Sequence, residues 1–270
     1  MQKPGPAELD SICSRLLPAV EKTAQFLLDE RQRFRQESVE YKGMNNLVSY
    51  VDKEAEKMMV KACQEVLPEA GFITEEGTVD PADGQSNLVW IIDPLDGTTN
   101  FVHGLPVFSV SVGLVWEGNP ILGIVAHAPE RKIFHAREGG GAWCNGRQIF
   151  VSKEKQLENS LLATGFPYYD FEQMPQYLSV LDHLMKNSHG LRRMGSSAID
   201  LAYVACGIFD GFFEYNLSPW DVAGGICLVR EAGGIVSDFN GTNNALFGKQ
   251  IVAGGPVQPA LLEAIRERWT

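Results

Sequence analysis

Residues 90–103 constrain this chain more than any other stretch, because they read Trp-Ile-Ile-Asp-Pro-Leu-Asp-Gly-Thr-Thr-Asn-Phe-Val-His. The apolar run from Leu88 to Ile92 predicts a buried strand. Two carboxylates, Asp93 and Asp96, follow at once and enclose a proline turn. The pattern therefore places acidic side chains at the end of a buried strand.

The residues that follow these acids indicate a helix that begins beside them. Residues 97–100 are a glycine, two threonines and an asparagine, which are residue types common at helix starts. Helix-start amides bind anions, and paired carboxylates bind hard divalent cations. A phosphate held against metal ions suits this arrangement. The same residues also make good turns, so spacing alone leaves open a corner in which Asp93 and Asp96 only cap and turn.

Charge and composition exclude some classes of partner. The chain has 270 residues, 44% of them hydrophobic, which is enough for a sizeable core in one domain or two. Its 23 basic and 34 acidic side chains give a formal net charge of −11, which argues against nucleic acid or an anionic membrane as the main partner. A small anionic substrate stays compatible, because bound metal ions make an acidic site locally positive. We expect no signal segment and no membrane span.

The cysteines and histidines point away from other kinds of site. The five cysteines are odd in number, widely spaced and without a Cys-x-x-Cys pair, so neither a disulfide framework nor a zinc cluster is indicated. A cytoplasmic location follows as the expectation. The five histidines have no metal-ligand spacing, and the absence of a serine nucleophile elbow disfavours a Ser-His-Asp hydrolase.

The N-terminal part of the chain is predicted to alternate helices and short strands. Helical spacing of apolar residues predicts a helix over 7–36, and a hairpin or loop over 41–52 leads into a helix over 52–67. A short apolar strand then delivers Glu75 and Glu76. Because adjacent strand residues point to opposite faces, only one of these glutamates can enter a shared site.

The rest of the chain divides into a meander and an α/β part. Alternating runs predict antiparallel strands over 108–116, 121–127, 132–137, 141–144 and 147–151. Beyond a polar segment, strands are predicted over 161–165, 191–194, 211–215, 235–238 and 251–253, and helices over 171–186, 196–206, 219–232 and 259–268. We therefore expect two subdomains, residues 1–155 and residues 156–270.

Two places in the second subdomain carry potential chemistry. Asp221 stands at a predicted helix start behind Pro219, where it could also be only a favourable charge at a helix N-terminus. Residues 195–197 make a second glycine-to-helix turn, preceded by two arginines. Such a turn can hold hydroxyls or phosphate, although a simple cap is the commoner explanation.

Three acid-bearing motifs, at 72–76, 90–101 and 220–224, together resemble the inositol monophosphatase family in order, spacing and overall length. The resemblance implies an α/β (α+β) fold, a layered αβαβα sandwich of the inositol monophosphatase / fructose-1,6-bisphosphatase type. It also implies a lithium-sensitive, Mg²⁺-dependent phosphatase that forms a homodimer.

The resemblance assigns metal ligands by motif. Glu75, Asp93 and the backbone carbonyl of Leu95 would hold one Mg²⁺, and Asp93, Asp96 and Asp221 a second, with a third, weaker ion near Glu75. Residues 1–155 would thus carry most of the ligands. Oxygen-only ligands favour Mg²⁺ over Zn²⁺.

The resemblance also assigns catalytic and substrate-binding residues. Thr98, hydrogen-bonded to Asp52, would position and help deprotonate the attacking water, with Glu75 also counted as catalytic. The amides of Gly97 and Thr98 would hold the phosphate. The positions that match contacts to the polyol are Asp96, Gly195, Ser196, Ser197 and Glu214.

Some positions depart from the family pattern. Thr74 replaces a usual glycine, Ser49 replaces a usual threonine, and Lys42 lies one residue nearer Asp52 than in many relatives, which leaves its place in the site open. None of these departures removes a metal ligand. The serines at 196–197 leave the identity of the substrate open.

The resulting prediction is a Mg²⁺-dependent phosphomonoesterase that hydrolyses myo-inositol 1-phosphate, or a similar small sugar phosphate, with a metal-activated water. Two cations neutralise the phosphate, acidify the water and hold the leaving alkoxide. One alternative is a phosphatase of the same fold for fructose 1,6-bisphosphate, 3′-phosphoadenosine 5′-phosphate, histidinol phosphate or NADP, although Glu214 favours a polyol. Another is a non-catalytic regulatory protein that associates with RNA-synthesis machinery, as some bacterial relatives do.

Overall fold

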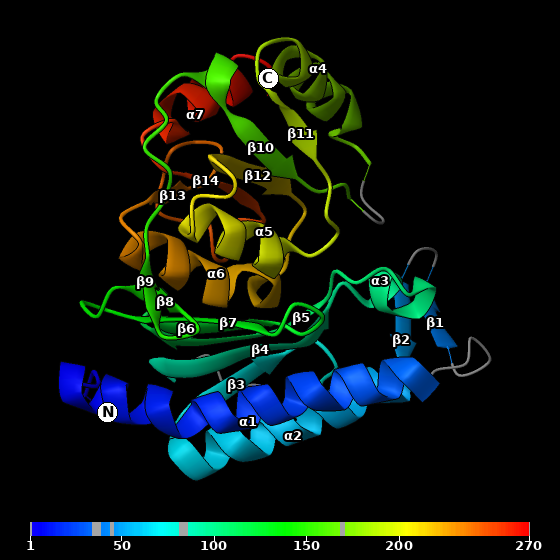
Figure 1. The fold of residues 1–270 in the computed structure, drawn as a ribbon, viewed down its shortest axis with the longest axis vertical. Coiled ribbons are helices and arrows are strands. Elements are labelled where there is room, and N and C mark those ends of the chain that lie inside the picture. The colour runs from blue at the N-terminus through cyan, green and yellow to red at the C-terminus, as the bar shows by residue number, and fades with distance from the viewer. Residues whose placement is uncertain (1, 34–38, 44–45, 81–85, 168–170, 270) are drawn as a thin grey trace.

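Five alternating layers of helix and sheet build the molecule, and they are stacked from bottom to top in Figure 1. The computed structural model describes residues 2–33, 39–43, 46–80, 86–167 and 171–269. The helices of the three helical layers are, in pairs from bottom to top, α1 (Pro6–Arg33) and α2 (Tyr50–Val66), α5 (Ser197–Ala205) and α6 (Pro219–Glu231), and α4 (Met174–Lys186) and α7 (Gln258–Arg266). The predicted αβαβα sandwich is confirmed.

The larger sheet has seven strands in the order β3-β4-β5-β6-β7-β8-β9. They are β3 (Gly71–Thr74), β4 (Leu88–Asp96), β5 (Ser109–Trp116), β6 (Asn119–His127), β7 (Lys132–Arg137), β8 (Ala142–Cys144) and β9 (Arg147–Ile149). β3 runs parallel to β4, and every later neighbour is antiparallel. The predicted meander is therefore confirmed.

The smaller sheet has five strands in the order β11-β10-β12-β14-β13. They are β10 (Leu161–Thr164), β11 (Gly190–Arg192), β12 (Gly211–Tyr215), β13 (Ile235–Ser237) and β14 (Gln250–Gly254). β10 is parallel to β11 and β12, while β14 is antiparallel to β12 and β13. The predicted α/β alternation is found, and the division of the chain at residue 155 stays a prediction.

Short elements complete the chain. A hairpin of β1 (Val39–Gly43) and β2 (Asn46–Ser49) leads directly into α2. The short helix α3 (Thr98–His103) follows β4, and a 3₁₀ turn, η2 (Leu157–Asn159), precedes β10. The side chains of Lys42 and Ser49 lie outside the described residues.

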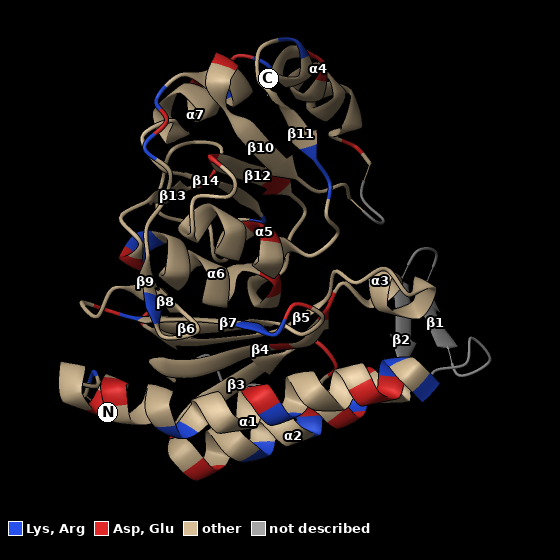
Figure 2. Cartoon of the chain, in the orientation of Figure 1, with Lys and Arg blue, Asp and Glu red and all other residues tan. Residues whose placement is uncertain are grey.

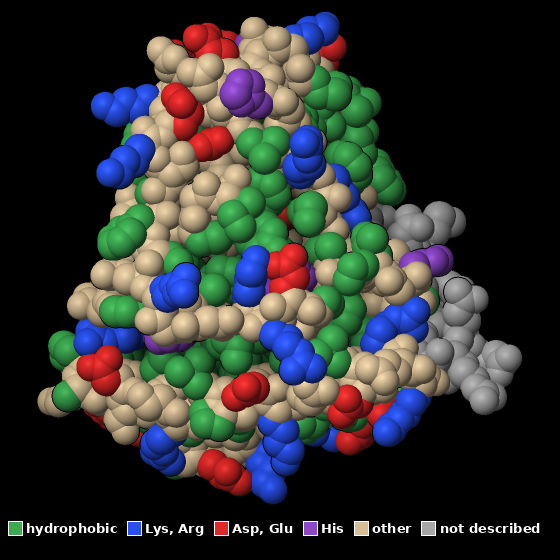
Figure 3. Space-filling model, in the orientation of Figure 1, with side chains coloured by type: hydrophobic (Ala, Val, Ile, Leu, Met, Phe, Trp, Pro, Cys, Tyr) green, Lys and Arg blue, Asp and Glu red, His purple; other side chains and the backbone are tan. Residues whose placement is uncertain are grey.

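Charge is distributed according to the layers. Charged side chains of both signs follow the outer helices α1 and α2 (Figure 2), and they are scattered over the lower part of the surface in Figure 3. The inward stripe of α1 carries Leu9, Leu16, Val20 and Leu27, each at most 1% exposed. This is the helical spacing that the sequence predicts, and it packs α1 against α2 and the larger sheet.

Glycines let α6 approach the larger sheet closely. A Cβ atom on Gly113 of β5 would lie 2.7 Å from the Cβ of Ala223, and one on Gly123 of β6 would overlap the carbonyl of Gly224. Helix and sheet are therefore in backbone contact, which side chains at these positions would prevent. This contact fixes the start of α6, and with it Asp221, against the sheet.

In the described part of the chain, no helix combines the length and the apolar character that crossing a membrane requires.

Candidate active site

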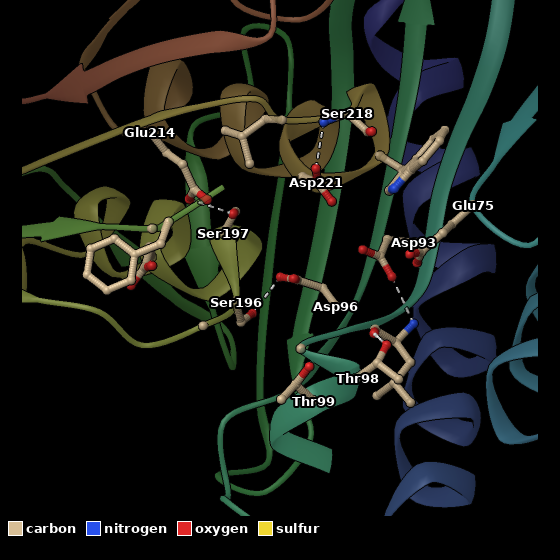
Figure 4. A pocket seen from close by; sticks show the side chains of 18 of the residues that line it. Glu75, Asp93, Asp96, Thr98, Thr99, Ser196, Ser197, Glu214, Ser218 and Asp221 are labelled. Atoms are coloured by element: carbon tan, nitrogen blue, oxygen red, sulfur yellow. Dashed lines mark hydrogen bonds between the residues drawn. The ribbon is translucent and has the colours of Figure 1, made fainter. Parts of the chain in front are cut away.

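A cavity of about 250 Å³ opens where the ends of β4, β10 and β12 meet the starts of α3, α5 and α6. Every residue that the sequence proposed for a site lines it except Asp52, which reaches it through Thr98. In Figure 4, Asp93, Asp96 and Asp221 face one another, and Ser197 and Glu214 lie on the far side of Asp96. Both halves of the chain thus contribute to one pocket.

A β-bulge brings Asp93 and Asp96 to the same pocket. The strand does not end at Ile92 as the sequence suggested but continues to Asp96. Asp93 pairs with Ser111 and Asp96 with Ser109, so three steps on β4 match two steps on β5. Residues three apart on a regular strand point to opposite faces, and one extra residue restores the phase. The proline-containing turn is therefore a bulge within a paired strand.

Glu75 enters the pocket from the end of β3, next to Asp93. Its backbone N–H donates to the carbonyl of Ile92 (3.3 Å), which extends the β3–β4 pairing. Of the two consecutive glutamates, Glu75 lines the pocket. The backbone N–H of Glu76 instead donates to Glu56 Oε2 (2.7 Å).

The buried Glu56 of α2 holds this loop, and sequence reasoning missed it. Its two carboxylate oxygens accept the backbone N–H groups of Glu76 and Thr78, both at 2.7 Å, and the residue is fully buried. Glu56 stands one helical turn after Asp52, so the two acids share a face of α2. An acidic pair on the buried face of a helix was the available signal.

The carboxylates at this end of the pocket repel one another. Burial, followed by the charge of Asp221, raises the pKa of Glu75 well above its usual value. Burial and the charge of Glu75 do the same for the pKa of Asp93. Burial, then Asp96, raises the pKa of Asp221 to about 7.

The side chain of Asp96, the last residue of β4, packs against the start of α5. Its Oδ2 accepts from the hydroxyl of Ser196 (2.5 Å) and the backbone N–H of Ala198 (2.8 Å). Ser196 is also the N-cap and accepts from the N–H of Ile199 (3.3 Å). Burial raises the pKa of Asp96 to about 6, against the opposing effect of these hydrogen bonds. The turn at residues 195–197 therefore binds the carboxylate of Asp96. Ser196 is the helix cap, which is one of the two alternatives that the sequence left open.

Asp221 belongs both to the start of α6 and to the cavity. Its Oδ2 accepts from the backbone N–H of Ser218 (2.6 Å), which stabilises the start of α6. The same residue lines the cavity and faces Asp93 and Asp96.

Thr98 lies between a buried carboxylate and the carbonyl of Leu95. Its Oγ1 is 3.1 Å from Asp52 Oδ1 and 3.0 Å from the Leu95 oxygen. A hydroxyl has one proton, so it donates to one of these acceptors at a time and keeps lone pairs for a third partner. The predicted Thr98–Asp52 pair is therefore formed, with Asp52 only 1% exposed.

Gly97 and Asn100 fix the turn between β4 and α3. Gly97 has φ +93°, and a Cβ there would lie 2.9 Å from the oxygen of Val107, so glycine is required. Asn100, which sequence reasoning counted only as a helix-start residue, donates through Nδ2 to the carbonyls of Val107 (2.8 Å) and Met194 (2.9 Å). These bonds tie the start of α3 to the loop before α5.

The opposite end of the pocket holds Ser197 and Glu214. The Ser197 hydroxyl donates to Glu214 Oε2 (3.0 Å), and burial raises the pKa of Glu214 to about 8. A Cβ at Gly165 would overlap the Glu214 carboxylate, so this glycine makes room for it. Asp200 and Asn216 also line this end, and sequence reasoning missed both.

The chemistry of the donors fits hard divalent cations. Within the described ranges, no three side chains of His, Cys, Asp or Glu already stand close enough together to hold one ion. The four carboxylates at Glu75, Asp93, Asp96 and Asp221 nevertheless line one pocket together with Leu95. Oxygen donors of this kind suit Mg²⁺, and cations would relieve the repulsion among the acids.

Comparisons with known proteins show the family of this chain. Residues 8–270 match the model of the inositol monophosphatase family. The chain is 40% identical to "Nus factor SuhB" of Pseudomonas aeruginosa, over 88% of this chain and 89% of that protein. It is also 40% identical to "Inositol-1-monophosphatase" of Mesorhizobium japonicum, over 85% and 86%.

A solved structure shares the fold of this chain. The extragenic suppressor protein suhB of Bartonella henselae superposes with a TM-score of 0.88 at 37% identity, covering 95% of this chain and 98% of that one. Fold and pocket together define a phosphatase of the layered αβαβα class. The chain belongs to the inositol monophosphatase family, whose members are generally metal-dependent.

Proposed function

We propose that this protein is a Mg²⁺-dependent phosphomonoesterase that acts on myo-inositol 1-phosphate or a closely similar small polyol phosphate. The observation that carries the proposal is the cavity that joins four carboxylates at one end to Ser197 and Glu214 at the other. The relative named inositol-1-monophosphatase supports the same choice.

Two Mg²⁺ sites are proposed at the acidic end. Glu75, Asp93 and the Leu95 carbonyl would hold one ion, and Asp93, Asp96 and Asp221 the other, with a weaker third ion near Glu75. Bound Mg²⁺ supplies charge neutralisation and a more acidic water. The amides of Gly97 and Thr98, which line the same cavity, would orient the phosphate.

Thr98 and Asp52 would handle the proton of the attacking water. When Thr98 donates to Asp52, its lone pairs stay free, and because Thr98 lines the cavity its hydroxyl would accept a hydrogen bond from a water there. The water proton can then move to Thr98 while the Thr98 proton moves to the buried Asp52 carboxylate. The pair would thereby orient the water and accept its proton, although the ionisable member, Asp52, does not itself line the cavity.

A panel of phosphate esters tests the proposal. Phosphate release is measured with Mg²⁺ from myo-inositol 1-phosphate, fructose 1,6-bisphosphate, 3′-phosphoadenosine 5′-phosphate, histidinol phosphate and NADP. We expect the highest kcat/KM for the inositol ester, with activity lost in chelator and restored by Mg²⁺. A higher kcat/KM for another ester would refute the substrate, and activity that survives chelation would refute the metal.

A second candidate function follows from the other relative. That protein is named Nus factor SuhB, and its 40% identity to this chain suggests a regulatory role beside or in place of catalysis. The complete acidic set favours retained catalysis. Failure to release phosphate from any monoester with Mg²⁺ present would favour the regulatory role.

Location and assembly remain predictions. A cytoplasmic location agrees with the five cysteines, all of which are unpaired. The homodimer that the family suggests would be checked by light scattering of the eluted protein.

A further inference from the structure

The pairing of β10 with β12 ends beside Glu214. Thr164 is the last residue of β10, and it lies opposite Phe213 of β12. The residues that follow on the two strands are Gly165 and Glu214. Because β10 leaves the sheet at this point, the backbone groups near its end need hydrogen-bond partners other than the neighbouring strand.

Two buried hydroxyl groups supply these partners. Thr164 Oγ1 lies 2.9 Å from the carbonyl oxygen of Phe213, and the hydroxyl of Tyr177, in α4, lies 2.9 Å from that of Gly165. The two hydroxyl oxygens are 2.5 Å apart, so the hydroxyls and the carbonyls form one network. Burial, followed by the charge of Glu214, raises the pKa of Tyr177 well above its usual value, so this hydroxyl keeps its proton and can donate.

Tyr177 reaches the network from the face of the smaller sheet that is opposite the pocket. Phe213 and Tyr215 pack with Tyr177 in the apolar layer beneath α4 and α7. Glu214, which stands between them in β12, points to the other face and accepts from Ser197 of α5. Figure 1 shows α4 and α5 on opposite sides of this sheet. Tyr177 does not line the cavity, so it can influence Glu214 through the backbone of the strands.

The position of Gly165 determines the space that the Glu214 carboxylate has. A Cβ at Gly165 would lie 2.0 Å from Glu214 Oε1, so the carboxylate occupies the place that a side chain would take. On its other side, Glu214 Oε2 accepts from the hydroxyl of Ser197 (3.0 Å). The carbonyl that Tyr177 binds belongs to the same glycine, so loss of that hydrogen bond would let the wall beside the carboxylate move.

The ring and the hydroxyl of Tyr177 have separate contacts. The ring centre lies 5.7 Å from that of Phe213, 4.7 Å from that of Tyr215 and 6.1 Å from that of Trp269. A phenylalanine would keep these aromatic contacts. The packing of this layer therefore accounts for an aromatic residue at position 177, and the network at the end of β10 accounts for its hydroxyl.

We propose that Tyr177 and Thr164 are positioning residues, which hold Gly165 and thereby keep the Glu214 carboxylate in place at one end of the cavity. The inference rests on the proposed function, in which Glu214 contacts the alcohol of the substrate. It adds α4, a helix of the outer layer, to the parts of the molecule that determine how the site binds its substrate. Neither residue would contact the reacting atoms.

The first test removes the hydroxyl of Tyr177 and keeps the ring. In Tyr177→Phe, KM for myo-inositol 1-phosphate should rise about tenfold, while kcat at saturating Mg²⁺ stays within about twofold because the acidic end is intact. Thr164→Val should have the same effect, whereas Thr164→Ser, which keeps a hydroxyl, should retain the KM of the wild type. The control is Tyr203→Phe, which removes a buried hydroxyl that contacts His127 outside the cavity and should leave KM unchanged. An unchanged KM in Tyr177→Phe would overturn the proposal.

A double-mutant cycle tests whether Tyr177 acts through Glu214. Tyr177→Phe is combined with Glu214→Ala, which removes the carboxylate. If Tyr177 positions that carboxylate, Tyr177→Phe should change KM by less than about twofold in the Glu214→Ala protein. The same rise in KM with and without the carboxylate would show a general structural effect, and the positioning role would be wrong.

Crystal structures test the positioning without any turnover. In the Tyr177→Phe protein, Gly165 should shift and the Glu214 carboxylate should lose its hydrogen bond to Ser197. If both residues keep their places, the proposal is refuted. If the wild type releases phosphate from none of the esters, the proposed function fails, and the two structures still decide whether Tyr177 positions Glu214.

Discussion

The carboxylates of the pocket fall into two pairs that the protein treats differently. Asp96 and Asp221 accept hydrogen bonds from the starts of α5 and α6, and their pKa values rise only to about 6 and about 7. Asp93 and Glu75 mainly face other acids, and the pKa of each is raised well above its usual value. The first pair therefore serves the fold as well as the pocket. The second pair is the one whose repulsion the proposed cations would relieve most.

The largest expected effect is a loss of activity, and it should be similar for an acid of either pair. Asp93→Asn and Asp96→Asn should each lower Mg²⁺-dependent kcat/KM by about three orders of magnitude, because each removes a proposed ligand and a bound metal contributes several kcal/mol. Phosphate release from myo-inositol 1-phosphate measures this. Asp182→Asn, an exposed acid of α4, is the control. Near-normal activity in either pocket variant would refute the ligand assignment.

Thr98 should influence turnover more than metal binding. Thr98→Ala removes the hydroxyl between Asp52 and the Leu95 carbonyl, so kcat should fall by about a hundredfold as proton transfer is lost. The Mg²⁺ concentration for half-maximal activity should change little, and Thr98→Ser should restore most of kcat. If Thr98→Ala instead abolished Mg²⁺ binding, measured by calorimetry, the water-positioning role would be wrong.

Stability should separate the two pairs of acids. Asp96→Ala leaves the Ser196 hydroxyl and the Ala198 N–H without their acceptor, which should lower the free energy of unfolding by about 1–3 kcal/mol. Asp93→Ala removes an acid that other acids repel and an acceptor for one amide, that of Leu95. Denaturant unfolding without metal compares the variants. Equal destabilisation would mean that the two pairs do not differ.

Local pattern was sufficient to predict most of the fold. The predicted helices and strands of the meander and of the α/β half recur within a few residues, because each carries its own periodicity and its own turn signals. The start of α2 near Asp52 and the turn at Gly97 were likewise local features. The end of β4 could not be predicted locally, because the bulge at 93–96 depends on pairing with β5.

The site required long-range information that one stretch of sequence does not hold. The Ser196 turn was indicated as a cap or an anion site, and the choice depended on Asp96, one hundred residues earlier. Glu56 was hidden because its partners are backbone amides of another segment. Asp200 and Asn216 resembled ordinary helix and turn residues until the fold placed them at one cavity. The roles carried over from the family stay predictions.

The smallest effect on activity is expected for Glu56, a buried acid that lies outside both pairs. It is a carboxylate fully satisfied by backbone amides and outside the pocket, so it should act only by positioning Glu75. Glu56→Gln keeps one acceptor and turns two donor hydrogens toward the amides of the loop. The Mg²⁺ concentration for half-maximal activity should rise about tenfold, as for other residues that orient metal ligands, while kcat at saturating Mg²⁺ changes little.

Glu54→Gln on the exposed side of α2 is the matched control. A fall in kcat that saturating Mg²⁺ does not rescue would show that Glu56 supports the fold of the pocket as a whole, and Glu56 would then belong with Asp96 and Asp221.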